Sequence, residues 1–375
     1  MNRKKLTTHF LPPASCILPL TSCILLLTSC LPTPTPPPTP IPTSTLTSTP
    51  FPTTTPTPTL TPTPTLVPTL DPTAVAATIA AGETRLGATS VEPLCLRWED
   101  TDDDGEPEWV GLHVRPEEPP RLAAFVLDGD AWYDLAAPEK EKHGLGEHPA
   151  CELEVRDLNA DGRTEILVWG HAETSTDLLH IFVWDGTSYA LLAFFEGEAG
   201  VRLENSDGDL SDEVVVGYEA GDDLVWEAVY TWDGANYAWT WERYAWFYLD
   251  RPHAYHTDTP EHAVISFYLA LDDRDLPGAY GLLSASAQAA QPYETWAVGF
   301  ATTVAAEVGA VHETARSGDS ATVVAQVRAY DNVDGRVFAT LWDVTWTVVH
   351  TEAGWRLVGA TANQLDRWEL PYYRQ

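Results

Sequence analysis

An acidic segment of fixed spacing occurs three times in the chain, each time directly before an apolar run. The second copy, DLNADGRTEILVWG, begins at Asp157, the first, DTDDDGEPEWVGL, at Asp100, and the third, NSDGDLSDEVVVGY, at Asn205. The spacing is the same in all three, although the third copy has Leu210 where the other two have a glycine. A repeat with a period of about 50–55 residues indicates a chain built from similar supersecondary units. No other feature constrains the fold as strongly.

Each unit continues to an Asp-Gly pair that lies between two apolar runs. The segments are FVLDGDAW (125–132), FVWDGTSY (182–189) and YTWDGANY (230–237). Asp-Gly in this setting is a strong signal for a β-hairpin. We therefore predict that each unit consists of a loop, two strands, a turn and a further strand.

The spacing of the acids predicts calcium loops. Calcium binds six to eight oxygens, and carboxylates at alternate positions of a tight loop can turn several oxygens inward, while glycine permits the turn. The candidate ligands are Asp157, Asn159, Asp161 and Glu165 in the second loop, Asp100, Asp102, Asp104 and Glu108 in the first, and Asn205, Asp207, Asp209 and Glu213 in the third. The alternative is a set of acidic β-turns that bind no metal. If calcium binds, we expect its role to be structural, pinning the turns.

This pattern resembles the FG-GAP or VCBS-type repeat of integrin-like β-propellers, over residues 92–245. The resemblance implies an all-β repeat domain, placed at residues 90–250, whose units are like propeller blades. Propellers have four or more blades, whereas three repeats are visible here. We therefore expect a compact module of three blade-like units.

A second domain of different character is expected at residues 259–367. Thr259 followed by Pro260 is typical of a helix start, and Asp275 and Pro292 mark two further short helices. Four runs with strand-like alternation follow, at 304–316, 320–330, 336–350 and 354–363. Helices followed by an antiparallel meander predict an α+β fold.

The segments PEHAVISFYLALDDRDLPGAYGLLS (260–284) and GWRLVGA (354–360) look like the nuclear-transport-factor-two-like superfamily, also called SnoaL-like. That resemblance implies a cone-shaped α+β domain whose curved antiparallel sheet encloses an apolar pocket. Some members are isomerases or dehydratases and need acid–base groups in the pocket. The candidates here are Tyr268, His312 and Asp343, against the alternative that they are ordinary core and strand residues.

The N-terminus reads as a secretory signal peptide over residues 1–29. Basic residues Arg3, Lys4 and Lys5 precede an apolar run at 17–27 that is too short to span a bilayer. The run ends in Leu27-Thr28-Ser29-Cys30, which resembles the lipobox of bacterial lipoproteins and implies a lipid on Cys30. Because ILPLTSC (17–23) nearly repeats as ILLLTSC (24–30), Cys23 remains an alternative.

Residues 30–88 are expected to form a stalk behind that cysteine. Half of the chain's 30 prolines lie between residues 31 and 72, with threonine in most of the gaps. Proline removes backbone donors, so such a stretch favours extended polyproline II over helix or sheet. A short alanine-rich helix is expected at 74–88.

Charge and cysteine content restrict the partners and the compartment. The formal net charge of −34 excludes a nucleic-acid partner, which would need a basic footprint. Cys16 and Cys23 leave with the signal peptide, so Cys95 and Cys151 remain as a pair, and an oxidising compartment favours a disulfide between them over two free thiols.

These observations predict a lipid-anchored protein on the extracellular face of the cell membrane. We expect a non-enzymatic, calcium-stabilised binding module whose partners are the membrane, through the anchor, and an envelope polysaccharide or protein. The chain contains no Gly-x-Ser-x-Gly, no His-Glu-x-x-His and no candidate nucleophilic cysteine. The alternative is an extracellular isomerase-like or hydrolase-like enzyme that uses the pocket of the C-terminal domain.

Overall fold

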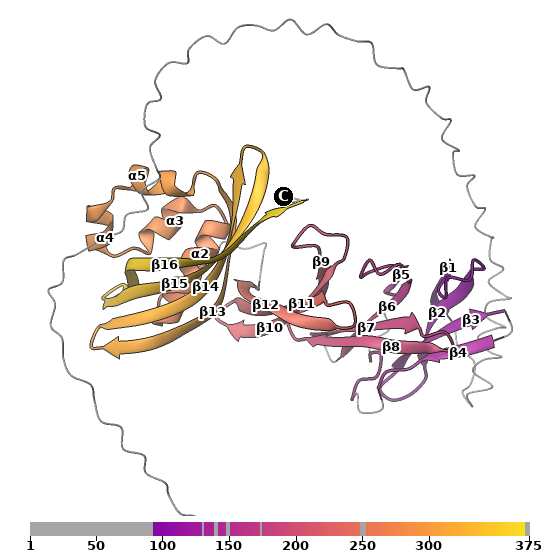
Figure 1. Cartoon of the computed structure of the whole chain (residues 1–375). Helices are drawn as coiled ribbons and strands as arrows, with labels where there is room; N and C mark the ends of the chain where they lie inside the picture. Colours follow the sequence, from indigo (N-terminus) through magenta and orange to yellow (C-terminus); the bar gives the residue numbers. More distant parts are fainter. Residues whose placement is uncertain are drawn as a thin grey trace, which may run out of the picture. The chain divides into compact units, whose positions relative to one another are not determined.

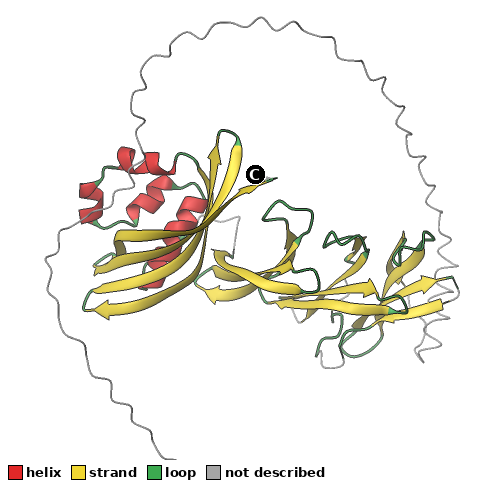
Figure 2. Cartoon of the chain, in the orientation of Figure 1, coloured by secondary structure: helices red, strands yellow, loops and turns green. Residues whose placement is uncertain are grey.

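The chain folds into a mostly β structure with a few short helices (Figures 1 and 2). The computed structural model describes residues 93–129, 131–138, 142–147, 151–172, 175–247 and 253–371. Cys23, Cys30, the stalk and the alanine-rich segment therefore lie outside the described residues. Within the described part, the strands form four antiparallel sheets of four strands each, and none of these sheets closes into a barrel. The prediction of a β-rich, antiparallel chain is confirmed.

Three of the sheets are meanders that correspond to the three sequence repeats. The first contains β1 (Pro93–Glu99), β2 (Glu108–Arg115), β3 (Arg121–Asp128) and β4 (Ala131–Leu135). The second contains β5 (Leu153–Arg156), β6 (Glu165–Ala172), β7 (Thr176–Trp184) and β8 (Tyr189–Gly197). The third contains β9 (Val201–Glu204), β10 (Glu213–Gly221), β11 (Leu224–Trp232) and β12 (Tyr237–Trp246). We call these the first, second and third repeat sheets.

The Asp-Gly pairs lie at the hairpins, as predicted. Asp185 shows the mechanism: its backbone amide donates to the carbonyl of Ser188, while its carboxylate accepts from the amides of Thr187 and Ser188. Gly186, the next residue, has a φ of 97°, a left-handed conformation that favours glycine. Asp233 caps the equivalent turn between β11 and β12 in the same way. The sequence thus sets both turns through local hydrogen bonds.

Apolar residues pack between successive repeat sheets. Val110, Val126 and Leu135 of the first sheet join Ile166, Val168 and Phe182 of the second in one cluster. The opposite face of the second sheet supplies Leu167, Leu179 and Ile181 to another cluster, with Val214 and Val216 of the third. The second sheet is therefore buried on both faces, which explains why its central strands read as near-continuous apolar runs.

The remaining sheet carries all of the described helices. Its strands are β13 (Thr303–Ser317), β14 (Ser320–Val333), β15 (Arg336–Thr351) and β16 (Gly354–Leu370). They follow α2 (Pro260–Asp272), α3 (Leu276–Gly281), α4 (Ala285–Ala290), α5 (Tyr293–Ala297) and the 3₁₀ turn η1 (Val298–Phe300). Buried side chains of α2, among them Val264, Phe267 and Leu271, join Val323, Val344 and Trp346 of the sheet in one core. Helices and sheet therefore share one hydrophobic core.

All three predicted helix starts are present in the structure. Thr259 accepts from the amide of His262, and Asp275 accepts from the amide of Gly278. Pro292 directly precedes α5 but makes no side-chain cap bond. The sequence did not lead us to predict α4. Ser284 caps the start of this helix, and its side chain accepts a hydrogen bond from the backbone amide of Ala287. The six residues of α4 are too few for a helical periodicity to show.

A buried ion network joins the third repeat sheet to the C-terminal sheet. Arg243 of β12 is only 9% exposed, and it bonds to Glu204 at 2.6 Å, Glu227 at 2.8 Å and Glu307 of β13 at 2.5 Å. The backbones also meet, because a Cβ on Gly309 of β13 would lie 2.0 Å from the carbonyl oxygen of Glu242. The contact between β12 and β13 is thus both polar and close.

Candidate metal-binding loops

The three acidic loops occupy equivalent places in the fold. Each connects the first and second strands of a repeat sheet: β1 to β2, β5 to β6 and β9 to β10. In each, the glutamate at the ninth loop position begins the second strand and is almost fully buried. It accepts a hydrogen bond from the backbone amide of the second loop residue, in the pairs Glu108–Thr101 at 2.7 Å, Glu165–Leu158 at 2.8 Å and Glu213–Ser206 at 2.6 Å. One carboxylate therefore closes every loop.

The backbone of the loops depends on left-handed residues. The fourth loop position has a positive φ in all three copies, at Asp103 (64°), Ala160 (57°) and Gly208 (76°). The sixth is left-handed only where it is glycine, at Gly105 (90°) and Gly162 (87°). Leu210 does not adopt this conformation, and the third loop instead places its glycine two positions earlier. The third loop thus follows a modified turn.

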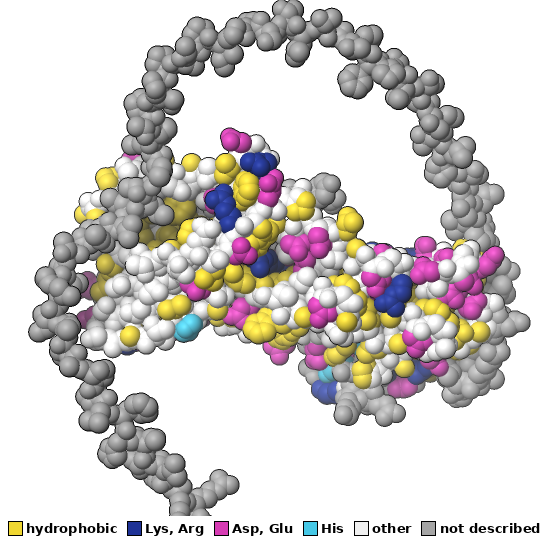
Figure 3. All heavy atoms as spheres, in the orientation of Figure 1, with side chains coloured by type: hydrophobic (Ala, Val, Ile, Leu, Met, Phe, Trp, Pro, Cys, Tyr) yellow, Lys and Arg dark blue, Asp and Glu magenta, His cyan; other side chains and the backbone are white. Residues whose placement is uncertain are grey.

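The first loop brings four carboxylates together. Asp100, Asp102, Asp104 and Glu108 each offer an oxygen, and these oxygens lie within 4.8 Å of one another. Asp100 Oδ2 accepts from the amide of Gly105 at 3.0 Å, while Asp100 Oδ1 is buried and has no hydrogen-bond partner among the described residues. On the face drawn in Figure 3, acidic side chains gather over the region where Figure 1 labels β1. Four converging carboxylates with a buried unpaired oxygen fit a hard divalent cation.

The third loop brings three carboxylates together, with one difference. Asp207, Asp209 and Glu213 offer oxygens within 4.8 Å of one another, and Glu213 Oε1 is buried without a partner in the described structure. The amide of Asn205 is used internally, since Nδ2 donates to the carbonyl of Asp209 at 2.7 Å and Oδ1 accepts from the amide of Gly208 at 2.8 Å. Asn205 therefore braces the turn through both ends of its amide.

The second loop differs most from its sequence expectation. Asn159 donates to Glu165 Oε1 at 3.1 Å, and Arg163 bonds to Asp161 at 2.8 Å. Among the described residues, Asp157, Asp161 and Glu165 do not form a group whose carboxylate oxygens lie within 4.8 Å of one another. Arg163 supplies a positive charge, whereas the first and third loops contain no basic residue. The negative charge of the second loop is therefore partly neutralised by a side chain of the loop itself.

The closing glutamates of the second and third loops have similar pKa values, whereas the aspartates of the first and second loops differ. Burial raises the pKa of both Glu165 and Glu213 to about 7, and the neighbouring aspartates of each loop add to the effect. Burial likewise raises the pKa of Asp102, with Asp104, Asp128 and Asp100 contributing in that order. For Asp161, burial acts upward but is outweighed by hydrogen bonds and charge from Arg163, so its pKa is lowered. A bound cation would favour the ionised form in the first and third loops, where no basic side chain does so.

Each of the first two loops faces a tyrosine from the following unit, with different results. Tyr189 hydroxyl lies 2.5 Å from Thr101 Oγ1, which itself donates to Glu108. Tyr237 is the equivalent residue of the third unit, and its buried hydroxyl has no partner within the described residues. Leu158 occupies the position of Thr101 in the second loop and offers no hydroxyl. The hydroxyl of Tyr237 therefore lacks the partner that Tyr189 has because residue 158 is a leucine and not a threonine.

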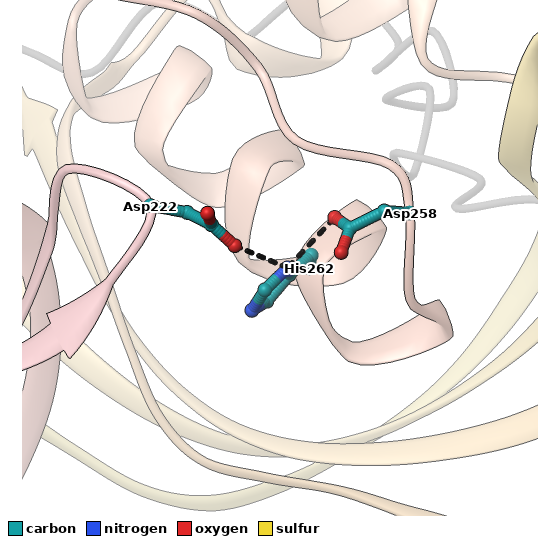
Figure 4. A group of neighbouring side chains, drawn as sticks. All are labelled: Asp222, Asp258 and His262. Carbon is teal, nitrogen blue, oxygen red and sulfur yellow. Dashed lines mark hydrogen bonds and ion pairs between the residues drawn. The ribbon is translucent and has the colours of Figure 1, made fainter.

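A further group of possible ligands, missed by sequence analysis, is formed by Asp222, Asp258 and His262 (Figure 4). His262 Nδ1 lies 2.8 Å from Asp258 and 3.8 Å from Asp222. Asp258 and His262 are four residues apart around the start of α2, whereas Asp222 comes from the β10–β11 turn, so only the fold brings it close. Both carboxylates are exposed and lie near the same ring nitrogen. This arrangement is typical of a histidine that pairs with carboxylates at the protein surface.

The structure does not bring the three candidate acid–base residues together. Tyr268 lies in the core, where its hydroxyl accepts from Trp346 Nε1 at 3.2 Å. His312 is exposed and bonds to the carbonyl of Ala310, and Asp343 accepts from Gln326. His312 and Asp343 alternate with the side chains that face the helices, so they lie on the other face of the sheet.

Cys95 and Cys151 form a disulfide, with Cα atoms 5.5 Å apart. The bond links β1 of the first repeat sheet to the segment that leads into β5 of the second. None of the described helices is long and apolar enough to cross a membrane.

Comparisons with known proteins add little to this geometry. No protein-family model matches the chain, and no curated protein matches it. Among solved structures, the chain is similar to the structure of Bdellovibrio bacteriovorus Bd1075, at 8% identity and a TM-score of 0.22. That match covers 50% of this chain and 90% of the other.

Proposed function

We propose that this protein is an extracellular lipoprotein that serves as a non-enzymatic, calcium-stabilised binding module at the cell envelope. Cys30 would carry the lipid, and the proline–threonine stalk would hold the folded part away from the membrane. Two acyl chains make a stable anchor where one is marginal. The folded part would then present its surfaces to a polysaccharide or protein of the envelope.

The observation that carries the calcium proposal is the pair of buried, unpaired carboxylate oxygens, Asp100 Oδ1 and Glu213 Oε1. Each belongs to a group of carboxylates that lacks a basic partner. A buried polar atom without a hydrogen bond is costly, and clustered carboxylates repel one another. A cation bound at either loop would remove both penalties at once.

The donor set favours calcium over other metals. The loop side chains that converge are carboxylates, with no sulfur or imidazole among them. Oxygen-only donors suit calcium and magnesium, and calcium tolerates the irregular geometry of a turn better than magnesium does. The expected role is structural, since each loop ties two neighbouring strands.

We further propose that the three repeat sheets correspond to FG-GAP-like blades and that the C-terminal part is a nuclear-transport-factor-two-like cone. The equal placement of the three loops, each between first and second strands, supports the first assignment. Four long antiparallel strands that share a core with the preceding helices support the second. The separation of Tyr268 from His312 and Asp343 is why we favour binding over catalysis.

Thermal unfolding of the full chain with calcium and with chelator tests the calcium proposal. At a calcium concentration about 100-fold above the dissociation constant, one site adds about 2.7 kcal/mol to the free energy of unfolding. For a folded part of this size, that corresponds to a rise in Tm of roughly 5 °C. Magnesium at the same concentration should produce a smaller rise.

Variants assign the effect to the loops. Asp102→Asn and Asp209→Asn should each reduce the calcium-dependent rise, because each removes one charged ligand. Glu352→Gln, an exposed residue of the β15–β16 turn, makes the same charge change elsewhere and should leave it intact. A Tm that does not respond to millimolar calcium would show that the loops are metal-free turns.

A further inference from the structure

A groove of about 540 Å³ opens beside β8, an edge strand of the second repeat sheet. It contains none of the candidate metal ligands, although Tyr237, which faces the second acidic loop, also lines it. One wall consists of consecutive residues of β8, so side chains from both faces of this edge strand contribute to it. The other wall consists of residues of the third repeat sheet. The lining residues are Leu192–Glu196, Glu198, Val216, Tyr218, Tyr230, Asn236 and Tyr237.

Aromatic rings dominate the walls of this groove. Phe195 packs edge-on against Tyr230, with centroids 5.1 Å apart, and against Tyr237, with centroids 5.9 Å apart. Phe195 is buried, whereas the tyrosines are only half-buried, so part of each tyrosine remains accessible from the groove. Edge-on packing holds the rings in place and keeps their electron-rich faces defined.

The charge of the groove is negative. Glu196 and Glu198 are both exposed, and the lining contains no lysine, arginine or histidine. Burial raises the pKa of Tyr218, and Tyr230 and then these two carboxylates add to the effect. A groove with aromatic walls and carboxylates at its rim attracts a cation whose surface is itself apolar.

We propose that this groove binds the quaternary ammonium group of a soluble ligand such as choline. The proposal rests on the proposed role as a binding module and names the class of ligand. A trimethylammonium group spreads its charge over methyl groups, so it loses little hydration on entering and gains contact with several ring faces. A primary ammonium holds its water more strongly, and a neutral sugar can donate hydrogen bonds to Glu196 and Glu198 but gains no charge attraction from them.

Ligand-observed NMR on the full chain tests this directly. Choline is compared with 3,3-dimethyl-1-butanol, which has the same shape but no charge, and both give one strong methyl signal. Choline is expected to bind, and the neutral isostere to bind at least about 10-fold more weakly. Tyr218→Leu and the double variant Glu196→Gln with Glu198→Gln should each weaken choline binding about 3- to 10-fold. Glu219→Gln changes an adjacent exposed carboxylate outside the lining and should have no effect.

Three results would overturn the proposal. They are equal binding of the two compounds, which would indicate an apolar or sugar-binding groove, no binding of choline at tens of millimolar, and binding that the double glutamate variant leaves unchanged. The titration is run with calcium and with chelator. Choline binding without any calcium-dependent stabilisation would refute the calcium proposal alone, whereas stabilisation without choline binding would refute the groove proposal alone.

Discussion

His180 should make the stability of this protein depend on pH in the mildly acidic range. The side chain lies on β7 with 0% exposure, its ring centroid is 4.6 Å from that of Phe194, and neither ring nitrogen has a hydrogen-bond partner within the described residues. Burial lowers its pKa from 6.5 to about 4. Between pH 4 and pH 6.5, His180 is therefore protonated in the unfolded chain but neutral in the folded chain. Stability is therefore fully present above pH 6.5 and is lost as the pH falls towards 4.

The size of the effect follows from the two pKa values. A difference of one pKa unit corresponds to about 1.36 kcal/mol, so the complete loss amounts to about 3 kcal/mol. Roughly 2 kcal/mol of this should already be lost between pH 7 and pH 5. His180→Leu removes the titrating group, so the variant should lack this part of the pH dependence. At pH 7 it should be at least as stable as the natural chain, because it replaces an unpaired polar group by an apolar one.

Urea unfolding of both chains at pH 7, 6 and 5, followed by tryptophan fluorescence, measures the difference. Other titrating groups, including His113 and the loop carboxylates, are present in both proteins and cancel in the comparison. His312→Leu removes an exposed imidazole and serves as the control. If His180→Leu loses as much stability from pH 7 to pH 5 as the natural chain does, His180 is not a buried neutral residue and the reasoning fails.

Four further predictions concern packing, turns and the anchor. Tyr189→Phe should cost about 1 kcal/mol of stability by removing the bond to Thr101, whereas Tyr237→Phe should cost nothing, and urea unfolding that ranks them in the reverse order would contradict this. Arg243→Met leaves three carboxylates without their shared partner and should cost about 3–5 kcal/mol, again by urea unfolding, with a loss under about 1 kcal/mol counting against a buried network. Gly162→Ala should lower stability by about 1 kcal/mol because of its φ of 87°, although no atom would meet the new Cβ, and Gly299→Ala, which is not left-handed, should be close to neutral. Cys30→Ala should abolish incorporation of a fatty-acid label and partition into detergent in a bacterial host, while Cys23→Ala should not, and the opposite result would move the anchor to Cys23.

Much of the local structure could be predicted because it depends on local chemistry. The Asp-Gly pairs set their turns through hydrogen bonds that span two or three residues, and Thr259 and Asp275 cap their helices in the same way. The four long C-terminal strands alternate in the sequence, and the structure places them within a few residues of their expected bounds, apart from a longer β16. The equal spacing of the acidic loops also led directly to their equal positions in the fold.

Features that depend on pairing between distant residues could not be predicted. Arg243 forms salt bridges with Glu204 and Glu307, which are 39 and 64 residues away, and no pattern in the sequence predicts these contacts. Asp222 approaches His262 only because the β10–β11 turn comes near the start of α2. The groove beside β8 likewise combines residues of two sheets. In these cases the sequence contains the residues but not the distances between them.

The three loops also show why similarity to a motif is a poor measure of metal affinity. The second loop keeps both the acids and the glycine of the pattern, yet Arg163 neutralises Asp161 and Asn159 bonds to Glu165. The first loop has no such compensation, and the third retains an unpaired buried oxygen on Glu213 despite the displaced glycine. What a cation gains at a site is the repulsion and desolvation that it relieves, and this depends on the charges left uncompensated by the protein. On this argument the first loop should bind calcium most tightly and the second most weakly, the reverse of the order that motif similarity alone would give for these two.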